Sequence, residues 1–286
     1  MKLSYYDTNH PHTAVVKDTY RITPEESPVE VRHITLLVPG GSLSFVEGQS
    51  IGVLISHENE FGNPHHLRLY SIASTRLGED GKGTEIAICV RRCTYIDEVN
   101  GEEYPGVASN YLCDRKPGDS ITITGPYGNH FTMPSSPDAN MIMVGVGTGI
   151  APFRAFVKRI FHEKGYWRGQ VRLFYGANHG LELLYMNDIA NDFNLYYDED
   201  SFRAFEAVSP RPHLQAPVTW EAHMNDYGEE VWNLMQDPNT YVYIAGLEPA
   251  LESFNKTMIK IADSEAAWSA IRQGLESSGR WAELIY

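Results

Sequence analysis

Short apolar segments separated by glycine- and proline-containing turns dominate residues 15–133. The turns include residues 39–41, 78–81 and 117–119. Several short strands at this spacing predict a closed antiparallel β-barrel, with a short helix at 111–114 before the final strands. The predicted strands are residues 15–22, 29–38, 50–55, 68–73, 84–90 and 119–125.

The pattern changes after a linker predicted at residues 133–138. Beyond it, apolar segments typical of buried strands alternate with segments typical of helices, which predicts a doubly wound parallel sheet with helices on both faces. We therefore expect two domains, an antiparallel β-barrel at 1–137 and an α/β domain at 138–286. The strands are predicted at 141–144, 171–175, 202–207 and 241–245, and the helices at 153–163, 229–237, 249–262 and 265–276.

A glycine-rich junction between a strand and a helix carries candidate chemistry. The apolar residues ending at Val144 are followed by Gly145, Gly147 and Gly149, and Pro152 opens the predicted helix. Such a turn lets the backbone approach a dinucleotide pyrophosphate, and the first N–H groups of the helix favour negative charge. Glycine turns without a nucleotide also exist, so this motif alone leaves both interpretations open.

A second candidate motif lies on the predicted strand at 68–73. Arg68 suits a phosphate, Tyr70 can stack on a flat ring, and the Ser71 hydroxyl can bond a ring nitrogen. An ordinary amphipathic strand is the alternative interpretation of these residues.

Composition narrows the possible partners. The 286 residues contain 23 Lys and Arg against 37 Asp and Glu, a formal net charge of −14, which argues against nucleic acid as a general partner. A local basic patch for an acidic protein stays compatible with this balance. The candidates for such a patch are Arg91, Arg92, Arg115, Lys116, Lys158 and Arg159.

Neither a membrane span nor a metal site is expected. No run of eighteen apolar residues exists, and the first twelve residues lack an apolar signal core, which predicts a cytoplasmic protein, or a stromal one after removal of a transit peptide. Cys89, Cys93 and Cys113 make neither a disulfide framework nor the four thiolates of an iron–sulfur site. The histidine pairs at 10/12 and 65/66 lack supporting ligands.

Taken together and in this order, the motifs resemble the plant-type ferredoxin–NADP(+) reductase family from about residue 30 to the end. The resemblance implies an FAD-binding barrel followed by an NADP(H)-binding domain. The matching elements are Arg68-Leu69-Tyr70-Ser71, Cys89-Val90-Arg91 with Tyr95, Gly106-Val107-Ala108-Ser109, Lys116-Pro117-Gly118-Asp119, Gly125-Pro126-Tyr127-Gly128, Gly147-Thr148-Gly149 with Pro152, Leu183-Leu184-Tyr185, the segment 241–247 and the final Tyr286.

The resemblance also implies roles for single residues. Arg68 and Ser109 would bind the FAD pyrophosphate, and Tyr95 the adenine end. Tyr70 and Tyr286 would cover opposite faces of the isoalloxazine, and Tyr286 would move aside for nicotinamide. The residues that the resemblance implies for FAD are Arg68, Leu69, Tyr70, Ser71, Cys89, Val90, Arg91, Tyr95, Gly106, Val107, Ala108, Ser109 and Tyr286. Those that it implies for NADP(H) are Gly147, Thr148, Gly149, Pro152, Gly176, Ser209, Arg211, Gly246, Leu247 and Glu248. The implied catalytic residues are Ser71, Tyr286 and Glu283.

Two departures from the family pattern concern the nicotinamide end. Ala245 stands where plant members have a cysteine, and Leu284 where they have a glutamate, with Glu283 one position earlier. In an extended strand that offset points the carboxylate of Glu283 to the other face, unless a local bulge restores it.

Two further elements concern the adenosine 2′-phosphate. A proline separates Ser209 from Arg211, and Glu221 falls in the later adenine-side element. Arg211 would neutralise a phosphate, whereas Glu221 would repel one and suits a free ribose hydroxyl. NADPH is therefore expected, with NADH as the alternative. Trp220 or Tyr227 would either stack on adenine or pack in the interior.

The predicted activity is electron transfer between NADP(H) and a one-electron carrier, ferredoxin or flavodoxin. Hydride would arrive at flavin N5 close to Ser71, and electrons would leave singly through the flavin semiquinone. One alternative is the NAD(P)H-dependent reductase component of an oxygenase system, such as an acyl-CoA epoxidase type, serving another iron–sulfur carrier. The other is a flavin-binding module without turnover.

Overall fold

The chain divides into two compact units, Met1–Thr132 and Met133–Tyr286, near the predicted linker. Each unit is described by itself. The computed structural model describes residues 6–41, 43–56, 65–97, 100–164, 167–177, 182–187, 190, 192–193, 202–205 and 219–286, and every statement below concerns these residues.

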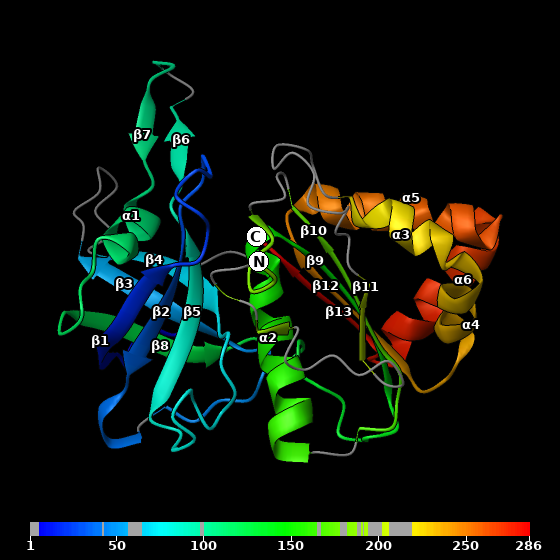
Figure 1. Ribbon diagram of the computed structural model, residues 1–286, viewed down its shortest axis with the longest axis horizontal. Helices are drawn as coiled ribbons and strands as arrows, with labels where there is room; N and C mark the ends of the chain where they lie inside the picture. Colours follow the sequence, from blue (N-terminus) through cyan, green and yellow to red (C-terminus); the bar gives the residue numbers. More distant parts are fainter. Residues whose placement is uncertain are drawn as a thin grey trace. The chain divides into compact units, whose positions relative to one another are not determined.

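A six-stranded antiparallel sheet is the main element of the first unit (Figure 1). Its strand order is β4-β3-β8-β1-β2-β5. The two end strands meet, because Ile72 forms an antiparallel bridge with Ile88 and the Ala73 N–H donates to the Ala87 carbonyl over 2.7 Å. The predicted closed barrel is therefore confirmed. Its strands are β1 (His12–Arg21), β2 (Val31–Leu37), β3 (Ser50–Ser56), β4 (His65–Ser71), β5 (Glu85–Arg91) and β8 (Ser120–Tyr127).

Alternation along these strands fills the barrel interior. Ile34 and Leu36 of β2 and Ile86 and Ile88 of β5 are buried in one apolar cluster. Because alternate side chains of β2 and β5 enter this cluster, a slip by one residue would take them out of it, and this fixes the register of these two strands.

A two-stranded hairpin and a short helix follow β5. The hairpin, β6 (Thr94–Ile96) with β7 (Glu103–Pro105), was not predicted, and its Tyr95 and Tyr104 rings stack at 5.8 Å. The helix α1 (Val107–Cys113) begins four residues before the predicted segment 111–114, directly after Gly106.

A parallel sheet of order β11-β10-β9-β12-β13 forms the centre of the second unit. The first four strands confirm the predicted ones, whereas β13 was not predicted. It pairs with β12 at the edge of the sheet. The strands are β9 (Asn140–Val146), β10 (Val171–Gly176), β11 (Phe202–Phe205), β12 (Thr240–Gly246) and β13 (Trp281–Ile285).

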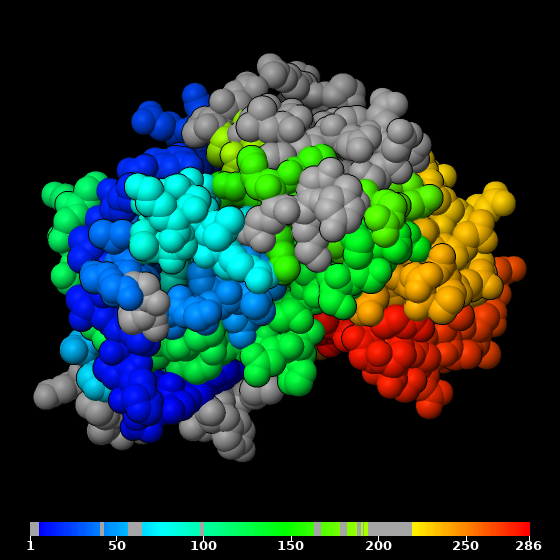
Figure 2. Space-filling model, turned by 90° about the horizontal axis from the view of Figure 1, so that it is seen from below, coloured from blue at the N-terminus to red at the C-terminus, as the bar shows by residue number. Residues whose placement is uncertain are grey.

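Helices cover both faces of this sheet, as predicted (Figure 1). α2 lies on one face, where Phe156 packs against Tyr243 with ring centroids 5.3 Å apart. The later helices pack on the other face, and Figure 2 shows their outer surface in yellow to red. The helices are α2 (Ile150–Arg159), which continues in a π-helical turn (Ile160–Lys164), α3 (Trp220–Asp226), α4 (Gly228–Gln236), α5 (Glu248–Ala262) and α6 (Glu265–Ser277).

Phe254 on α5 lies at the centre of an aromatic cluster that joins these helices to the sheet. Its ring is 6.1 Å from that of Trp220, 5.8 Å from Trp268 and 5.7 Å from Trp281. Phe254 is fully buried, so its neighbours cannot be rehydrated without opening the packing between α3, α5, α6 and β13.

Phe254→Ala tests this packing. The cavity left by the ring should lower the free energy of unfolding of the second unit by about 3–5 kcal/mol. Urea unfolding followed by tryptophan fluorescence measures it, because three indoles surround the site. The control is Ile96→Ala on the hairpin, where the side chain is 70% exposed and the change should stay within about 0.5 kcal/mol. Equal losses in the two variants would contradict the central role of Phe254.

Candidate functional site

The predicted glycine turn is built by close approach of two backbones. β9 leads into a 3₁₀ turn (Gly147–Gly149) and then α2. A Cβ on Gly149 would lie 2.2 Å from the Ala245 carbonyl oxygen, so only glycine fits there. Gly147 has φ +56°, and its carbonyl accepts a 2.8 Å hydrogen bond from the Tyr175 hydroxyl. The turn is therefore fixed by the Ala245 backbone of β12 on one side and by the Tyr175 hydroxyl of β10 on the other.

Neither the glycine turn nor the opening of α2 has a side-chain cap. The first N–H group of α2, at Ile150, bonds the Gly147 and Thr148 carbonyls, and Pro152 lacks an N–H, so the donors left for an anion lie mainly in the glycine turn that opens the helix. The first N–H groups of a helix have no partner within it, and together with the helix dipole they favour an anion. This geometry fits a pyrophosphate, as the sequence predicts.

The other predicted NADP(H) residues lie at the same edge of the sheet. Gly176, Val146 and Gly246 stand at the carboxyl ends of β10, β9 and β12, which are neighbours in the sheet. Leu247, 54% exposed, is the N-cap of α5, and Glu248 is its first residue. In doubly wound sheets ligands bind at this edge. The structure thus brings together Gly147, Thr148, Gly149, Pro152, Gly176, Gly246, Leu247 and Glu248.

The adenine-side residues are described only in part. Ser209 and Arg211 lie outside the described residues. Trp220 is 3% exposed within the aromatic cluster, so the interpretation that it stacks on adenine is wrong and the packing alternative holds. Glu221 Oε1 accepts a 2.6 Å hydrogen bond from the Ser253 hydroxyl. Tyr227, between α3 and α4, is 39% exposed.

The last strand brings the end of the sequence to the glycine turn. β13 pairs with β12 so that Leu284 lies beside Ala245. The Tyr286 N–H donates to the Gly246 carbonyl over 3.2 Å, and its phenol oxygen is 3.0 Å from Thr148 Oγ1. The two positions where the sequence departs from the family pattern are therefore neighbours in register.

Glu283 points to the opposite face of the sheet. Its Oε1 accepts from Trp281 Nε1 over 2.6 Å and from Arg272 Nη2 of α6 over 3.2 Å. The Arg272 guanidinium lies 4.9 Å from the Trp281 ring centroid. The register of β13 shows no bulge, so the carboxylate stays on the α6 side. This placement corrects the expectation that Glu283 is a catalytic residue, which required a bulge in β13.

The predicted flavin motif lies on β4 in the first unit. Arg68 is exposed, and its Nη1 donates to the Leu67 carbonyl over 3.1 Å. Leu69, Tyr70 and Ser71 are half-buried. Burial raises the pKa of the Tyr70 phenol well above its usual value, so the ring is a neutral, flat surface at neutral pH.

A second glycine turn precedes α1. The Gly106 N–H donates to the Cys93 carbonyl over 2.8 Å, and a Cβ on Gly106 would lie 3.1 Å from that oxygen. Ser109 Oγ accepts from the Cys93 N–H over 3.1 Å, so this hydroxyl closes the turn. α1 has no side-chain cap and packs against β4 and β5, where Arg91 ends β5.

Two predicted flavin residues serve the barrel core with their side chains. Val90 and Ala108 are buried in it, and half-buried Val107 packs against it. Cys89 is buried as well but lies outside this cluster. For Val90 and Ala108 the backbone groups are therefore the part that a ligand can reach. Sequence reasoning missed Tyr104, which stacks on Tyr95. The two rings are opposite each other in the β6–β7 hairpin, and because that hairpin was not predicted, the sequence offered no signal for this pair.

The suggested basic patch is reduced by internal ion pairs. Arg92 donates to Glu30 over 2.7 Å and to Asp114 over 2.9 Å. Burial would raise the pKa of Glu30, but bonds from Arg92 and Arg32 outweigh it, and the pKa is lowered. Arg92 therefore helps to hold β5, α1 and the segment before β2 together, and its charge is largely compensated within the first unit.

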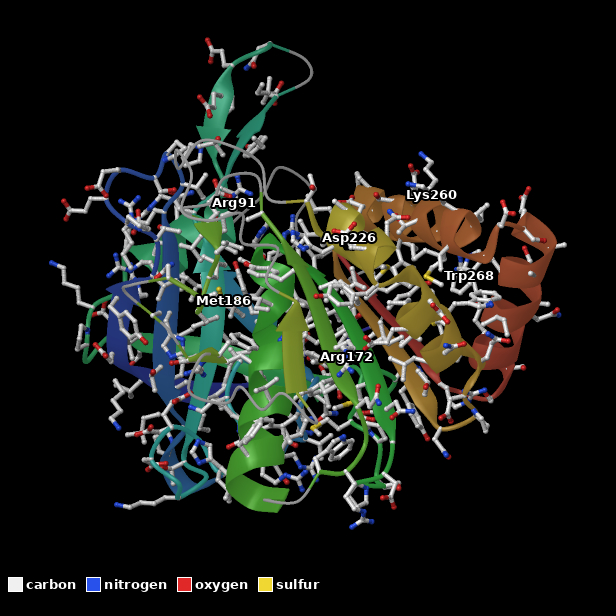
Figure 3. All side chains as sticks on the ribbon, turned by 45° about the vertical axis from the view of Figure 1, so that its right-hand side comes forward. Arg91, Arg172, Met186, Asp226, Lys260 and Trp268 are labelled. Carbon is white, nitrogen blue, oxygen red and sulfur yellow. The ribbon has the colours of Figure 1, made fainter. Side chains whose placement is uncertain are left out.

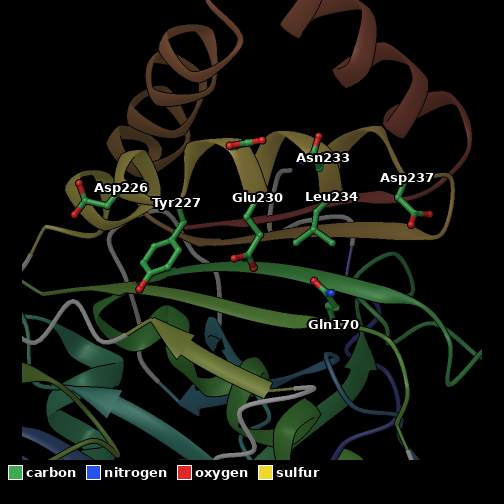
Figure 4. Close-up of a pocket in the computed structure, with 8 residues that line it drawn as sticks. Gln170, Asp226, Tyr227, Glu230, Asn233, Leu234 and Asp237 are labelled. Atoms are coloured by element: carbon green, nitrogen blue, oxygen red, sulfur yellow. The ribbon is translucent and has the colours of Figure 1, made fainter.

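A hollow lies along α4, lined by residues from both ends of this helix (Figure 4). It measures about 560 Å³ and begins where Gln170 and Asp237 precede β10 and β12. Arg172, labelled in Figure 3, pairs there with Glu230. The end at Gln170 and Asp237 is away from the carboxyl ends of the strands, where the glycine turn stands, whereas Tyr227, a predicted adenine contact, lines the other end. The lining of the hollow is Gln170, Asp226, Tyr227, Glu229, Glu230, Asn233, Leu234 and Asp237.

Two other kinds of feature are absent from the described residues. They contain no group of three or more His, Cys, Asp or Glu side chains arranged to hold a metal ion. They also contain no helix with the length and apolar character needed to cross a membrane.

Comparison with known proteins gives consistent relatives. A family model described as an oxidoreductase NAD-binding domain matches residues 143–256. The ferredoxin–NADP reductase of Synechocystis sp. is 36% identical over 98% of this chain and 68% of its own length. Leaf isozyme 1 of the chloroplast ferredoxin–NADP reductase of Arabidopsis thaliana is 36% identical over 98% of this chain and 79% of its own length. The solved structure of the Plasmodium falciparum ferredoxin–NADP+ reductase with 2′P-AMP matches with a TM-score of 0.71 at 20% identity, over 98% of both chains.

Gly149→Ala tests the close approach on which the turn depends. The added Cβ has to displace the Ala245 carbonyl, so the variant should lose about 1–3 kcal/mol of unfolding free energy in the second unit. The matched control is Gly274→Ala on α6, where a Cβ meets nothing within 4 Å and should gain up to about 1 kcal/mol. Urea unfolding measures both. Stabilisation by both substitutions would show that the turn is looser than described.

Proposed function

This chain belongs to the ferredoxin–NADP reductase family, and from that membership we propose that it passes electrons between NADP(H) and a one-electron carrier, ferredoxin or flavodoxin. At the coarser level it is an NADP-dependent flavoprotein oxidoreductase. One observation carries the proposal: relatives of that activity are 34–38% identical over at least 91% of this chain, a span that includes both glycine turns.

FAD is assigned to the first unit. The uncapped start of α1, the narrow turn at Gly106 and the exposed guanidinium of Arg68 form a donor set that fits a pyrophosphate. Tyr70 offers a neutral ring for stacking, and Ser71 stays the predicted hydrogen-bonding group at flavin N5. When bound, FAD supplies the exchange between hydride and single electrons.

NADP(H) is assigned to the second unit. The uncapped opening of α2 fits the pyrophosphate, because the missing side chain at Gly149 lets a ligand and β12 approach the same backbone. Ser209 and Arg211, predicted at the 2′-phosphate, stay predictions. Glu221 supports NADH as the alternative donor, because its carboxylate would repel the 2′-phosphate that NADPH carries and NADH lacks.

The nicotinamide end is apolar in this chain. Ala245 is fully buried, and Leu284 lies beside it in register. Glu283, on the opposite face and bonded to Arg272, adds no carboxylate there. On this proposal the side chains of the sheet exclude water from the reacting ring, and Ser71 is the one hydroxyl assigned to hydrogen-bond the flavin.

A second candidate function has its own support. The compensated charge of Arg92 and the net charge of −14 favour a partner other than a strongly acidic ferredoxin. Ala245 and Leu284, which depart from the plant pattern, also set this chain apart from the plant enzymes. The reductase component of an oxygenase system, with its own iron–sulfur carrier, fits these features. Relatives include chloroplast and cyanelle enzymes, and a cytoplasmic or stromal location stays a prediction for this chain.

The decisive experiment uses the purified, FAD-supplemented protein. Heat-released FAD should match the protein in amount, and stopped-flow mixing with NADPH should bleach the flavin absorption band within seconds. A plant-type and a bacterial-type ferredoxin as acceptors then separate the two candidate functions. Absence of FAD would contradict the proposal as a whole. Bound FAD that neither NADPH nor NADH bleaches within minutes would leave a flavin-binding module.

Glu221→Gln tests the nucleotide preference. Removing this charge should raise the NADPH-to-NADH ratio of kcat/KM by about two- to fivefold, the size typical of a partly exposed charge pair. The control is Glu265→Gln, an exposed carboxylate in the first turn of α6, which should leave the ratio unchanged. A ratio that moves equally in both variants would mean that overall charge, and not the position of Glu221, sets the preference.

A further inference from the structure

Two hydroxyl groups meet at the glycine turn of the second unit. Thr148 Oγ1 and the phenol oxygen of Tyr286 are 3.0 Å apart, a hydrogen-bond distance in which either oxygen can donate. Thr148 is half-buried in the middle of the turn, and the Tyr286 side chain is 56% exposed. The last residue of the sequence is therefore bonded to the segment assigned to the nucleotide.

The turn that carries Thr148 is rigid. Its first carbonyl, at Gly147, accepts from the buried Tyr175, and its last residue, Gly149, is pressed against the Ala245 carbonyl. Backbone anchored on both sides leaves Thr148 little room to follow a moving partner. The position of its hydroxyl is thus set by the sheet.

The backbone of Tyr286 is anchored as well. Its N–H donates to the Gly246 carbonyl, and the preceding strand pairs with β12 along its whole length. On the other face, Arg272 bonds Glu283 and covers Trp281. Two anchored backbones leave the side-chain torsions of Tyr286 as the simplest way to break the bond between the two hydroxyls.

We propose that Thr148 is a positioning residue that holds the Tyr286 ring across the glycine turn, so that an incoming dinucleotide has to break the Thr148–Tyr286 hydrogen bond. The inference rests on the proposed function, since it takes this turn as the NADP(H) site. The bond lowers the population of molecules with the ring turned away, and the apparent affinity for the nucleotide falls by the same factor. A neutral hydrogen bond of net strength about 0.5–1.5 kcal/mol corresponds to about two- to tenfold.

A double-mutant cycle tests the proposal. Isothermal titration calorimetry measures the Kd of NADP+ for the oxidised, FAD-loaded protein as wild type, Tyr286→Phe, Thr148→Val and the double variant. Tyr286→Phe keeps the ring and removes the hydroxyl, so it should tighten NADP+ binding about two- to tenfold. In the Thr148→Val background the same substitution should have no effect, because the bond is already absent. With Thr148→Ser, which keeps the hydroxyl, the effect of Tyr286→Phe should return.

A nucleotide fragment separates release of the ring from a change in the turn. 2′P-AMP lacks the nicotinamide half and does not require the ring to move, so its Kd should be the same in wild type and Tyr286→Phe. Tyr20→Phe and Thr122→Val, which change exposed side chains of the first unit in the same chemical way, should leave both affinities unchanged. Thr148→Ala replaces Thr148→Val in the cycle if the valine variant does not fold.

The outcomes are distinguishable. Failure of the folded wild type to bind either NADP+ or 2′P-AMP would overturn the proposed function and this inference together. Binding of both ligands, with Tyr286→Phe either silent or equally effective in both Thr148 backgrounds, would overturn the inference alone. Tightening of 2′P-AMP by Tyr286→Phe would do the same, since the effect would then arise in the turn itself.

Discussion

The contact between Gly149 and the carbonyl of Ala245 sets the geometry of the second unit. Because the two backbones approach more closely than any side chain allows, α2 starts directly against the end of β12. That placement leaves the glycine turn that opens the helix without a side-chain cap and at the carboxyl edge of the sheet. It also brings Thr148 beside the strand end that receives β13. The nucleotide assignment and the meeting of Thr148 with Tyr286 depend on this single approach.

In β13, moving a carboxylate from position 284 to position 283 moves it to the opposite face of the sheet, because successive side chains of a strand alternate between the two faces. The register of β13 with β12 places Leu284 beside Ala245 and sends Glu283 to α6, where Arg272 receives the carboxylate. A carboxylate one position later would stand next to Ala245. One face of the sheet therefore carries the two apolar residues that depart from the family pattern, Ala245 and Leu284. The other face carries the ion pair of Glu283 with Arg272. Both follow from the alternation of side chains along β13.

The charge of Arg92 in the first unit is used in ion pairs within the fold and is therefore less available to a partner. Arg92 carries the charge that a sequence comparison would assign to a docking surface, yet it bridges Glu30 and Asp114. Burial raises the pKa of Cys113 to about 12, so this thiol stays protonated and acts as a core residue. Arg68 and Arg91 stay the predicted contacts with FAD phosphate. The basic surface for a partner would then have to come from the other candidates, Arg115, Lys116, Lys158 and Arg159.

The sequence by itself determined the barrel, the parallel sheet with helices on both faces and the two glycine turns, because periodicity and glycine placement are local signals. It also indicated from the one-residue offset that Glu283 would face away from Ala245. It did not predict β13 or the β6–β7 hairpin, since such short segments become strands only through pairing with a neighbour. Only the tertiary structure decided that Trp220 is a core residue, that Arg92 is internally paired and that Tyr286 meets Thr148. Each of these depends on which distant segment packs alongside, and a pattern of single residues carries no such information.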